Sequence, residues 1–63
     1  MRVSKQLQRL RRERGLTQVG LARRARLHPI SVARWETGRR TPALATLRKL
    51  AKALGVKLRT LVE

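Results

Sequence analysis

The amino-acid sequence predicts an all-α fold, a single compact domain of five short helices over residues 1–63. Three observations lead to this expectation. Apolar residues recur at intervals of three and four, which is the period of a helix, and nowhere alternate as they would in a half-buried strand. Ser, Thr or Pro stands at the expected starts of the first four helices, and Gly stands near most expected ends. No repeat, low-complexity stretch or linker interrupts the chain.

The first two helices are predicted from their capping residues. Ser4 is a residue of the N-cap type and Gly15 suits the position just past a helix end. Thr17 is the expected N-cap of the second helix, which ends near residue 24 or 25. A new start signal follows so soon that Arg26 and Leu27 must form a tight turn.

The third helix is predicted from Pro29 to about Thr37, because proline is well tolerated at the first helical position. With this helix in place, Leu27, Val32 and Trp35 would face the interior. The lone Trp is therefore expected in the core and not as an exposed ring on which a nucleic-acid base could stack. The residues left outside are Pro29, Ile30, Ala33 and Arg34.

The fourth helix is predicted to start at Thr41-Pro42 and to end at Gly55, and residues 56–63 form a short fifth helix. Leu44, Leu47, Leu50, Ala51 and Leu54 make an apolar stripe on the fourth. The predicted core consists of Leu7, Leu10, Leu21, Val32, Trp35, Leu44, Leu47, Leu54, Val56 and Leu61.

Charge is the strongest compositional signal. There are 17 Lys and Arg residues against 3 Glu, a formal net charge of +14. A compact domain with this imbalance repels itself unless a polyanion is near, and nucleic acid is the usual partner. A bias toward Arg without functional meaning is the alternative explanation.

Composition also excludes several classes of function. The chain has no Cys and one His, so neither a disulfide framework nor a metal site is expected. No cofactor, catalytic triad, carboxylate pair or phosphate-binding glycine loop is indicated, so the chain is not expected to be an enzyme. No apolar run approaches the roughly 20 residues that cross a bilayer, and the start lacks the apolar stretch of a secretory signal. We expect a soluble, cytoplasmic protein.

Two helices joined by so short a turn form a helix-turn-helix unit, here at about residues 17–37. Its second helix, about residues 29–37, would fit the roughly 12 Å major groove of B-DNA. Arg34 has the fork that suits guanine, and Ile30 can touch a thymine methyl group. His28 either contacts DNA or merely fills space. The expected base-contacting residues are His28, Pro29, Ile30, Ala33 and Arg34.

The chain resembles the lambda-repressor-like (XRE/Cro) family of DNA-binding domains over essentially its whole length. The matching points are Leu16-Thr17-Gln18, Leu21-Ala22, Trp35-Glu36-x-Gly38, Pro42 and the run from Leu47 to Val56. Each is weak alone, but together they are specific in order and spacing. The resemblance implies operator binding as a homodimer.

The resemblance also implies roles for individual residues. Gln18 would bond a phosphate, with an ordinary early-helix Gln as the less favoured alternative. Arg11 and Glu36 match a pair that forms a salt bridge in some relatives, with a solvated Glu36 as the alternative. The expected phosphate contacts are Thr17, Gln18, Thr37, Arg39, Arg40 and Thr41, the last at the start of the fourth helix, where backbone N–H groups bind anions.

Two departures from the family pattern affect the interpretation. Arg26 stands where the usual turn residue is Gly, so it would be strained if the position needs positive φ. Pro29 and Ile30 stand where relatives often have polar base readers. The sequence therefore predicts few direct base contacts and a large electrostatic contribution to affinity.

The predicted function is that of a small sequence-specific regulator of transcription, and a repressor is the favoured type. The alternative is an antitoxin-type or controller protein that binds a protein partner, such as a toxin, as well as its own operator. RNA and membrane binding are less favoured, because aromatic platforms and one continuous amphipathic ribbon are missing. Leu58, Leu61 and Val62 are the expected dimer contacts, unless all three pack inward or are singly exposed.

Overall fold

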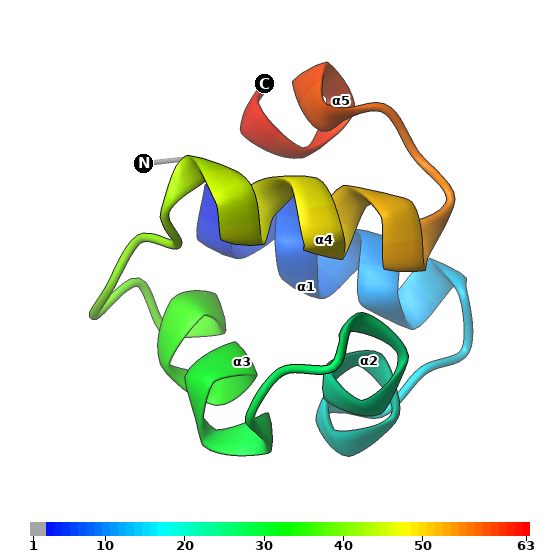
Figure 1. Ribbon diagram of the computed structural model, residues 1–63, viewed down its shortest axis with the longest axis vertical. Helices are drawn as coiled ribbons and strands as arrows, with labels where there is room; N and C mark the ends of the chain where they lie inside the picture. Colours follow the sequence, from blue (N-terminus) through cyan, green and yellow to red (C-terminus); the bar gives the residue numbers. More distant parts are fainter. Residues whose placement is uncertain (1–2) are drawn as a thin grey trace.

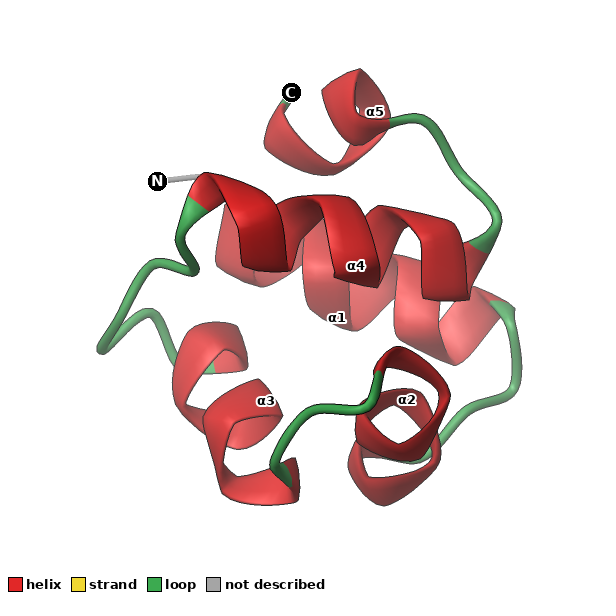
Figure 2. Ribbon diagram, in the orientation of Figure 1, coloured by secondary structure: helices red, strands yellow, loops and turns green. Residues whose placement is uncertain are grey.

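The computed structural model describes residues 3–63, and within that range it contains five α-helices and no strand (Figure 2). This confirms the predicted all-α, five-helix fold. Residues 1 and 2 of the predicted domain lie outside the described residues. The helices are α1 (Val3–Glu13), α2 (Gln18–Ala25), α3 (Pro29–Glu36), α4 (Leu44–Leu54) and α5 (Leu58–Val62).

Two helices, α1 and α4, run across the middle of the molecule, with α4 in front of α1 in the view of Figure 1. The short α5 covers one side of this pair and packs on both helices. On the other side α2 packs on α4 and α3 packs on α1, while α2 and α3 cross steeply and contact each other. The helix-turn-helix is therefore supported from behind by two different helices.

The core is built from aliphatic side chains of all five helices. The predicted core is confirmed for most of its members, and Trp35 and Val56 are half-buried against it. Leu44 was wrongly included, because its side chain is 56% exposed. It lies on the apolar stripe of α4 but in the first turn, beyond the edge of the core. The fully buried positions are Leu7, Leu21, Val32, Leu50, Leu54 and Leu61.

Two predicted helix starts are displaced. Ser4 lies inside α1, which already includes Val3, so it is not the N-cap. Thr41 does not cap α4 either, because that helix begins at Leu44 and its N-cap is Ala43. Pro42 is buried, and the loop that contains it leads into α4 two residues later than the sequence suggests.

The start of α2 and the end of α4 follow the sequence signals. Gly20 donates its backbone N–H to Thr17 Oγ1 at 2.9 Å, which confirms Thr17 as the N-cap. A Cβ atom at Gly20 would lie 3.1 Å from that same oxygen, so the glycine leaves room for the cap. Gly55 ends α4 with a φ of 69°, in the left-handed region that favours glycine.

Arg26 adopts the conformation that the sequence flagged as strained. It ends α2 with φ 57° and ψ 46°, and it is the one non-glycine residue with positive φ between residues 3 and 63. For a residue with a Cβ atom this conformation costs about 1–2 kcal/mol. Its backbone N–H bonds to carbonyls of the last turn, so the turn keeps its hydrogen bonds despite the strain.

Two arginines tie the end of α4 to other elements. Arg14 Nε donates to the carbonyl of Leu54 at 2.7 Å, and an Nη of Arg24 donates to that of Ala53 at 3.4 Å. These carbonyls have no partner within the helix, and cations are favoured at its negative end. Neither contact was predicted.

Two other features are absent from the part of the chain that the structure describes. No helix there is long and apolar enough to cross a membrane. No three His, Cys, Asp or Glu side chains within residues 3–63 gather where they could hold a metal ion.

The position of the core edge on α4 can be tested with a pair of leucines. Leu50→Ala should lower the free energy of unfolding by about 2–5 kcal/mol, because it leaves a cavity at a fully buried site. Leu44→Ala, the matched control on the same helix, should change it by less than about 0.5 kcal/mol. Urea denaturation followed by circular dichroism measures both. Equal losses would show that the core extends to the first turn of α4.

Candidate nucleic-acid interface

The outer face of α3 is free, as the sequence predicts. Val32 is fully buried, and Trp35 is half-buried against the core, so these two side chains fix the inner face of the helix. Pro29 and Arg34 are exposed, and Ile30 is 54% exposed. An apolar side chain so accessible at the centre of a helix-turn-helix is suited to an apolar contact outside the protein.

A shallow hollow of about 280 Å³ lies along this face. It is lined by Ile30, Ala33, Arg34, Thr37 and Arg39. The fold thus brings together three of the predicted base-contacting residues and two of the predicted phosphate-contacting ones. Apolar atoms form much of the surface between two guanidinium groups, a combination that fits base edges and phosphates side by side.

His28 stands at the start of this face. It is the N-cap residue of α3, but its side chain makes no capping hydrogen bond. The imidazole is exposed, so it does not fill space in the core. Pro29 follows at the first helical position, as predicted. The backbone N–H groups of the first turn are consequently not covered by a side chain of the cap.

The predicted salt bridge between Arg11 and Glu36 is present and nearly buried. Arg11 Nε lies 2.6 Å from Glu36 Oε2, and Nη2 donates to Oε1 at 3.0 Å, so the pair is bidentate. The side chains are 11% and 2% exposed. The hydrogen bond to Glu36 raises the pKa of Arg11, against the opposing effect of burial. This guanidinium is therefore charged at neutral pH.

The same pair also connects the start of α2. Arg11 Nη1 donates to the carbonyl of Leu16 at 2.7 Å, and Gln18 Nε2 donates to Glu36 Oε1 at 3.1 Å. A Gln amide has a second N–H and an oxygen. Gln18 can therefore stay bonded to Glu36 and still offer hydrogen-bonding groups to a phosphate. The sequence indicated the ion pair, but it gave no signal for the link between these two residues.

The two threonines predicted to contact phosphates are engaged differently. Thr17 accepts the N–H of Gly20 through its hydroxyl oxygen, so its hydroxyl proton remains available to a phosphate. Thr37 donates its hydroxyl to the carbonyl of Arg34 at 2.9 Å. Its proton is committed within the protein, and a phosphate contact through that proton would have to break this bond.

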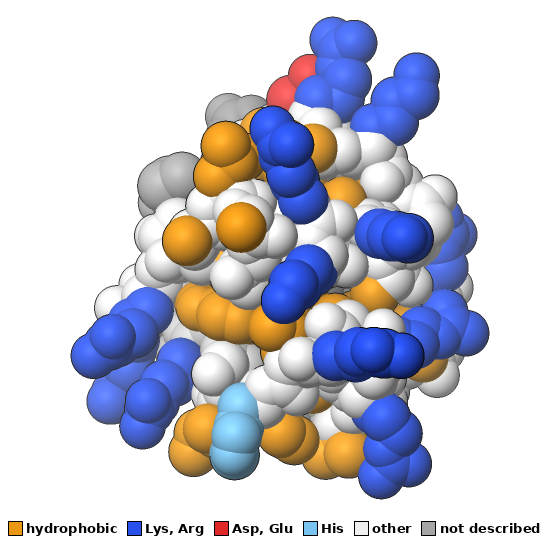
Figure 3. Space-filling view, viewed as in Figure 1, with side chains coloured by type: hydrophobic (Ala, Val, Ile, Leu, Met, Phe, Trp, Pro, Cys, Tyr) orange, Lys and Arg blue, Asp and Glu red, His pale blue; other side chains and the backbone are white. Residues whose placement is uncertain are grey.

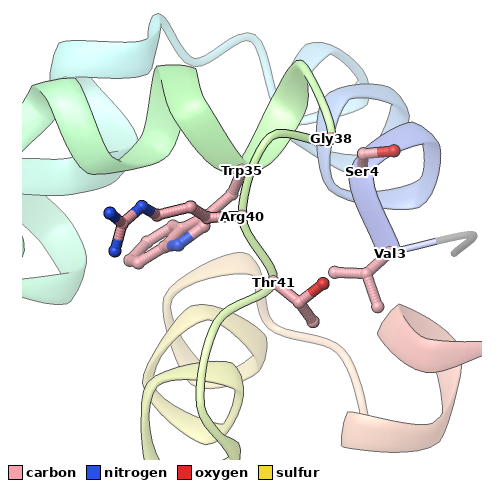
Figure 4. A pocket seen from close by; sticks show the side chains of 6 residues that line it. All are labelled: Val3, Ser4, Trp35, Gly38, Arg40 and Thr41. Atoms are coloured by element: carbon pink, nitrogen blue, oxygen red, sulfur yellow. The ribbon is translucent and has the colours of Figure 1, made fainter.

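The loop between α3 and α4 carries Arg39, Arg40 and Thr41, all exposed. Arg40 extends alongside the half-buried Trp35, and both line a small cavity of about 40 Å³ at the start of α1 (Figure 4). Thr41 lies in the loop and not at the N-terminus of α4, which corrects the expectation that helix N–H groups stand beside it.

The predicted dimer contacts on α5 are only partly available. Leu61 is fully buried in the core, so it has no surface to offer a second copy, contrary to the prediction. Leu58 is half-buried, and Val62 is 42% exposed. Because α5 packs on both α1 and α4, Leu61 and part of Leu58 are used for docking within the chain.

The surface charge is almost wholly positive. Each Glu of the described chain is paired with an Arg: Glu13 with Arg9 at 2.7 Å, Glu36 with Arg11, and Glu63 with Arg59 at 3.4 Å. Figure 3 shows one face, where Lys and Arg side chains stand over several elements and acidic atoms are visible only near α5. The local carboxylates thus leave most of the positive charge uncompensated.

Comparison with known proteins connects this geometry to a family. The profile of the Helix-turn-helix family HTH_3 matches residues 7–61. The restriction-modification controller protein C.AhdI of Aeromonas hydrophila superposes with a TM-score of 0.92 at 35% identity, over 95% of this chain and 91% of that one.

Two curated relatives have similar sequences but are longer. The immunity repressor protein of Bacillus phage phi105 is 40% identical over 98% of this chain and 43% of its own length. Multiprotein-bridging factor 1 of Debaryomyces hansenii is 44% identical over 94% of this chain and 39% of its own length. The chain thus spans about two-fifths of the length of these relatives.

The contribution of the buried ion pair can be measured by removing its cation. Arg11→Met should lower the free energy of unfolding by about 3 kcal/mol, because it leaves the carboxylate of Glu36 buried without its charge partner. Arg12→Met removes the neighbouring exposed cation, which makes no side-chain bond within residues 3–63, and should change it by less than about 0.5 kcal/mol. Urea denaturation at neutral pH measures the free energy of unfolding of both variants. Two equally stable variants would contradict a structural role for the pair.

Proposed function

We propose that this chain, which belongs to the lambda-repressor-like helix-turn-helix family, binds double-stranded DNA sequence-specifically with α3 in the major groove. The observation that carries the proposal is the two-sidedness of α3. Val32 and Trp35 hold its inner face, while Ile30 and Arg34 project from the other. The family is one of DNA-binding domains and not of enzymes, so binding is the activity to be explained.

Base recognition in this proposal depends on few side chains. Arg34 donates two parallel hydrogen bonds to O6 and N7 of a guanine, a contact that contributes about 1–3 kcal/mol of discrimination. Ile30 and Ala33 place apolar surface against a thymine methyl group. Pro29 supplies no donor, and His28 is accessible to a base edge or a phosphate. DNA shape contributes the remaining specificity.

Phosphate contacts surround this reading face. The free groups of Gln18 and the hydroxyl proton of Thr17 are available at the start of α2, and Arg39 and Arg40 stand in the loop after α3. If about five phosphates are neutralised per protomer, the logarithm of affinity falls with that of salt concentration with a slope near −0.9 times this number. The formal charge of +14 supports so large an electrostatic share.

The biological role that fits best is a transcriptional regulator acting on its own operator in the cytoplasm. An immunity repressor and a restriction-modification controller protein are among the similar proteins, and both support a regulatory role. The similarity to C.AhdI makes a controller-type protein the second candidate. A toxin partner remains a prediction of the sequence.

Dimerisation belongs to the same proposal, with a revised set of contacts. Leu44 and Val62 are among the large apolar side chains that the described chain exposes, and they lie on α4 and α5, which pack together. The accessible part of Leu58 adds to them. Burying these side chains between two copies would stabilise a small domain and set two α3 helices at half-sites about one helical turn apart.

The reading role of Arg34 is testable once binding-site selection from random duplex DNA has given the preferred site. Arg34→Met should reduce the preference for that site over random duplex by roughly tenfold to a hundredfold at equal salt. Arg48→Met, the control at an exposed position on α4, should weaken both complexes alike and keep the preference. Fluorescence anisotropy measures all the affinities. An unchanged preference without Arg34 would refute its reading role.

The revised dimer contact gives a second test, independent of DNA sequence. Val62→Glu should shift sedimentation equilibrium toward monomer, because it introduces a charge into an interface that would otherwise be apolar. Val19→Glu makes the same change at an exposed valine on α2 and should leave the association unchanged. A wild-type chain that is monomeric with and without DNA would remove the dimer from the proposal.

A further inference from the structure

A second basic surface lies away from the reading face of α3. It is an open groove of about 690 Å³ between the end of α2 and the second half of α4. None of its lining residues takes part in the hollow along α3. On the face shown in Figure 3, basic side chains stand over these two helices with apolar atoms between them. The groove is lined by Arg24, Ala25, Arg26, Lys49, Lys52 and Ala53.

Three of the four cations of this groove are not used by the fold. The side chains of Arg26, Lys49 and Lys52 make no hydrogen bond or ion pair within residues 3–63. Arg24 makes a single long bond, of 3.4 Å, to the carbonyl of Ala53. Four like charges around one hollow repel each other, and this repulsion destabilises the folded chain. An anion bound between them would reduce the repulsion.

This chain has few carboxylates that could supply that anion. Its three Glu residues are all paired with arginines on other surfaces, and it contains no Asp. A second copy of the chain is therefore a poor occupant, since it would bring the same excess of cations. The complementary charge must come from a different molecule.

The strained Arg26 is an independent reason to assign a function to this groove. Glycine would occupy its left-handed conformation without the steric cost, and the backbone hydrogen bonds of the turn do not require a side chain. Residues held in such conformations often serve binding sites. What arginine adds at this position is one guanidinium on the wall of the groove.

We infer that the groove between α2 and α4 binds an extended acidic segment of another protein, one in which small apolar residues separate the carboxylates. Two basic side chains at the end of α2 and two from α4 line the groove and would pair with carboxylates. Ala25 and Ala53 leave room between them for a polypeptide chain. A duplex is less suited, because its phosphates lie on a wide convex surface. The inference does not depend on the proposed DNA reading by α3.

The test compares two variants of equal net charge. Lys49→Glu with Lys52→Glu reverses two charges in the groove, and Lys5→Glu with Arg12→Glu reverses two exposed charges on α1. The probe is a fluorescein-labelled peptide in which aspartates alternate with alanines, and its anisotropy reports binding. The groove variant should bind the peptide roughly tenfold more weakly than the α1 variant, because close charge pairs become repulsive.

Two further measurements determine what occupies the groove. The same peptide with asparagine in place of aspartate should not bind the wild-type chain. Random duplex DNA should bind the two double variants equally, because their net charges match. Equal binding of the acidic peptide to both variants would overturn the inference. A duplex affinity that falls more for the groove variant would overturn it in favour of a second nucleic-acid surface.

Arg26→Gly separates the binding role from any role in folding. Removing the strain should raise the melting temperature, so a loss of binding cannot be attributed to unfolding. The same variant should bind the acidic peptide more weakly than the wild-type chain. A variant that is more stable and binds the peptide equally well would show that this arginine does not serve the groove.

Discussion

The helix-turn-helix depends on one nearly buried ion pair, between Arg11 of α1 and Glu36 at the end of α3. The carboxylate receives two bonds from the guanidinium and a third from Gln18 at the start of α2, and the guanidinium also holds the carbonyl of Leu16. Hydrophobic packing alone fixes α3 weakly, since Val32 is its one fully buried side chain. The hydrogen bonds around this ion pair supply the directional contacts that packing lacks, and they orient α2 and α3 against α1.

Arginine has three roles in this molecule. Arg11 neutralises a carboxylate inside the domain, and Arg14 satisfies a carbonyl at the end of α4. The exposed arginines of α3 and the following loop provide the charge and forked donors that nucleic acid requires. The high arginine content therefore has structural and binding roles at once, and the structural role is not visible in a count of charges.

Local signals in the sequence predicted most of the fold, because helix period and capping act over a few residues. The N-cap at Thr17, the strained turn at Arg26 and the buried face of α3 all depend on such short-range effects. The capping signals at Ser4 and Thr41 were nevertheless misleading. The predictions of burial went wrong where the outcome depends on what packs above a residue. Leu44 continues an apolar stripe beyond the edge of the core, whereas Leu61 lies fully inside it.

The predictions for the candidate sites divide in the same way, between features that local patterns indicate and features that depend on helix packing. The outward face of α3 follows from helical periodicity once its start is known. The bond between Gln18 and Glu36 joins residues 18 positions apart, and the basic groove joins the end of α2 to α4; no local pattern marks either. Such contacts arise from the way the helices pack, so only the three-dimensional arrangement reveals them.

The central claim is that the pair between Arg11 and Glu36 holds the two helices in place, and a double-mutant cycle measures it most directly. Arg11→Met, Glu36→Leu and the double variant are compared by urea denaturation. Each single change should cost more than the double change, because two apolar side chains can replace a buried pair but not one half of it. We predict a coupling free energy of about 2 kcal/mol or more. Single losses that simply add would contradict the account.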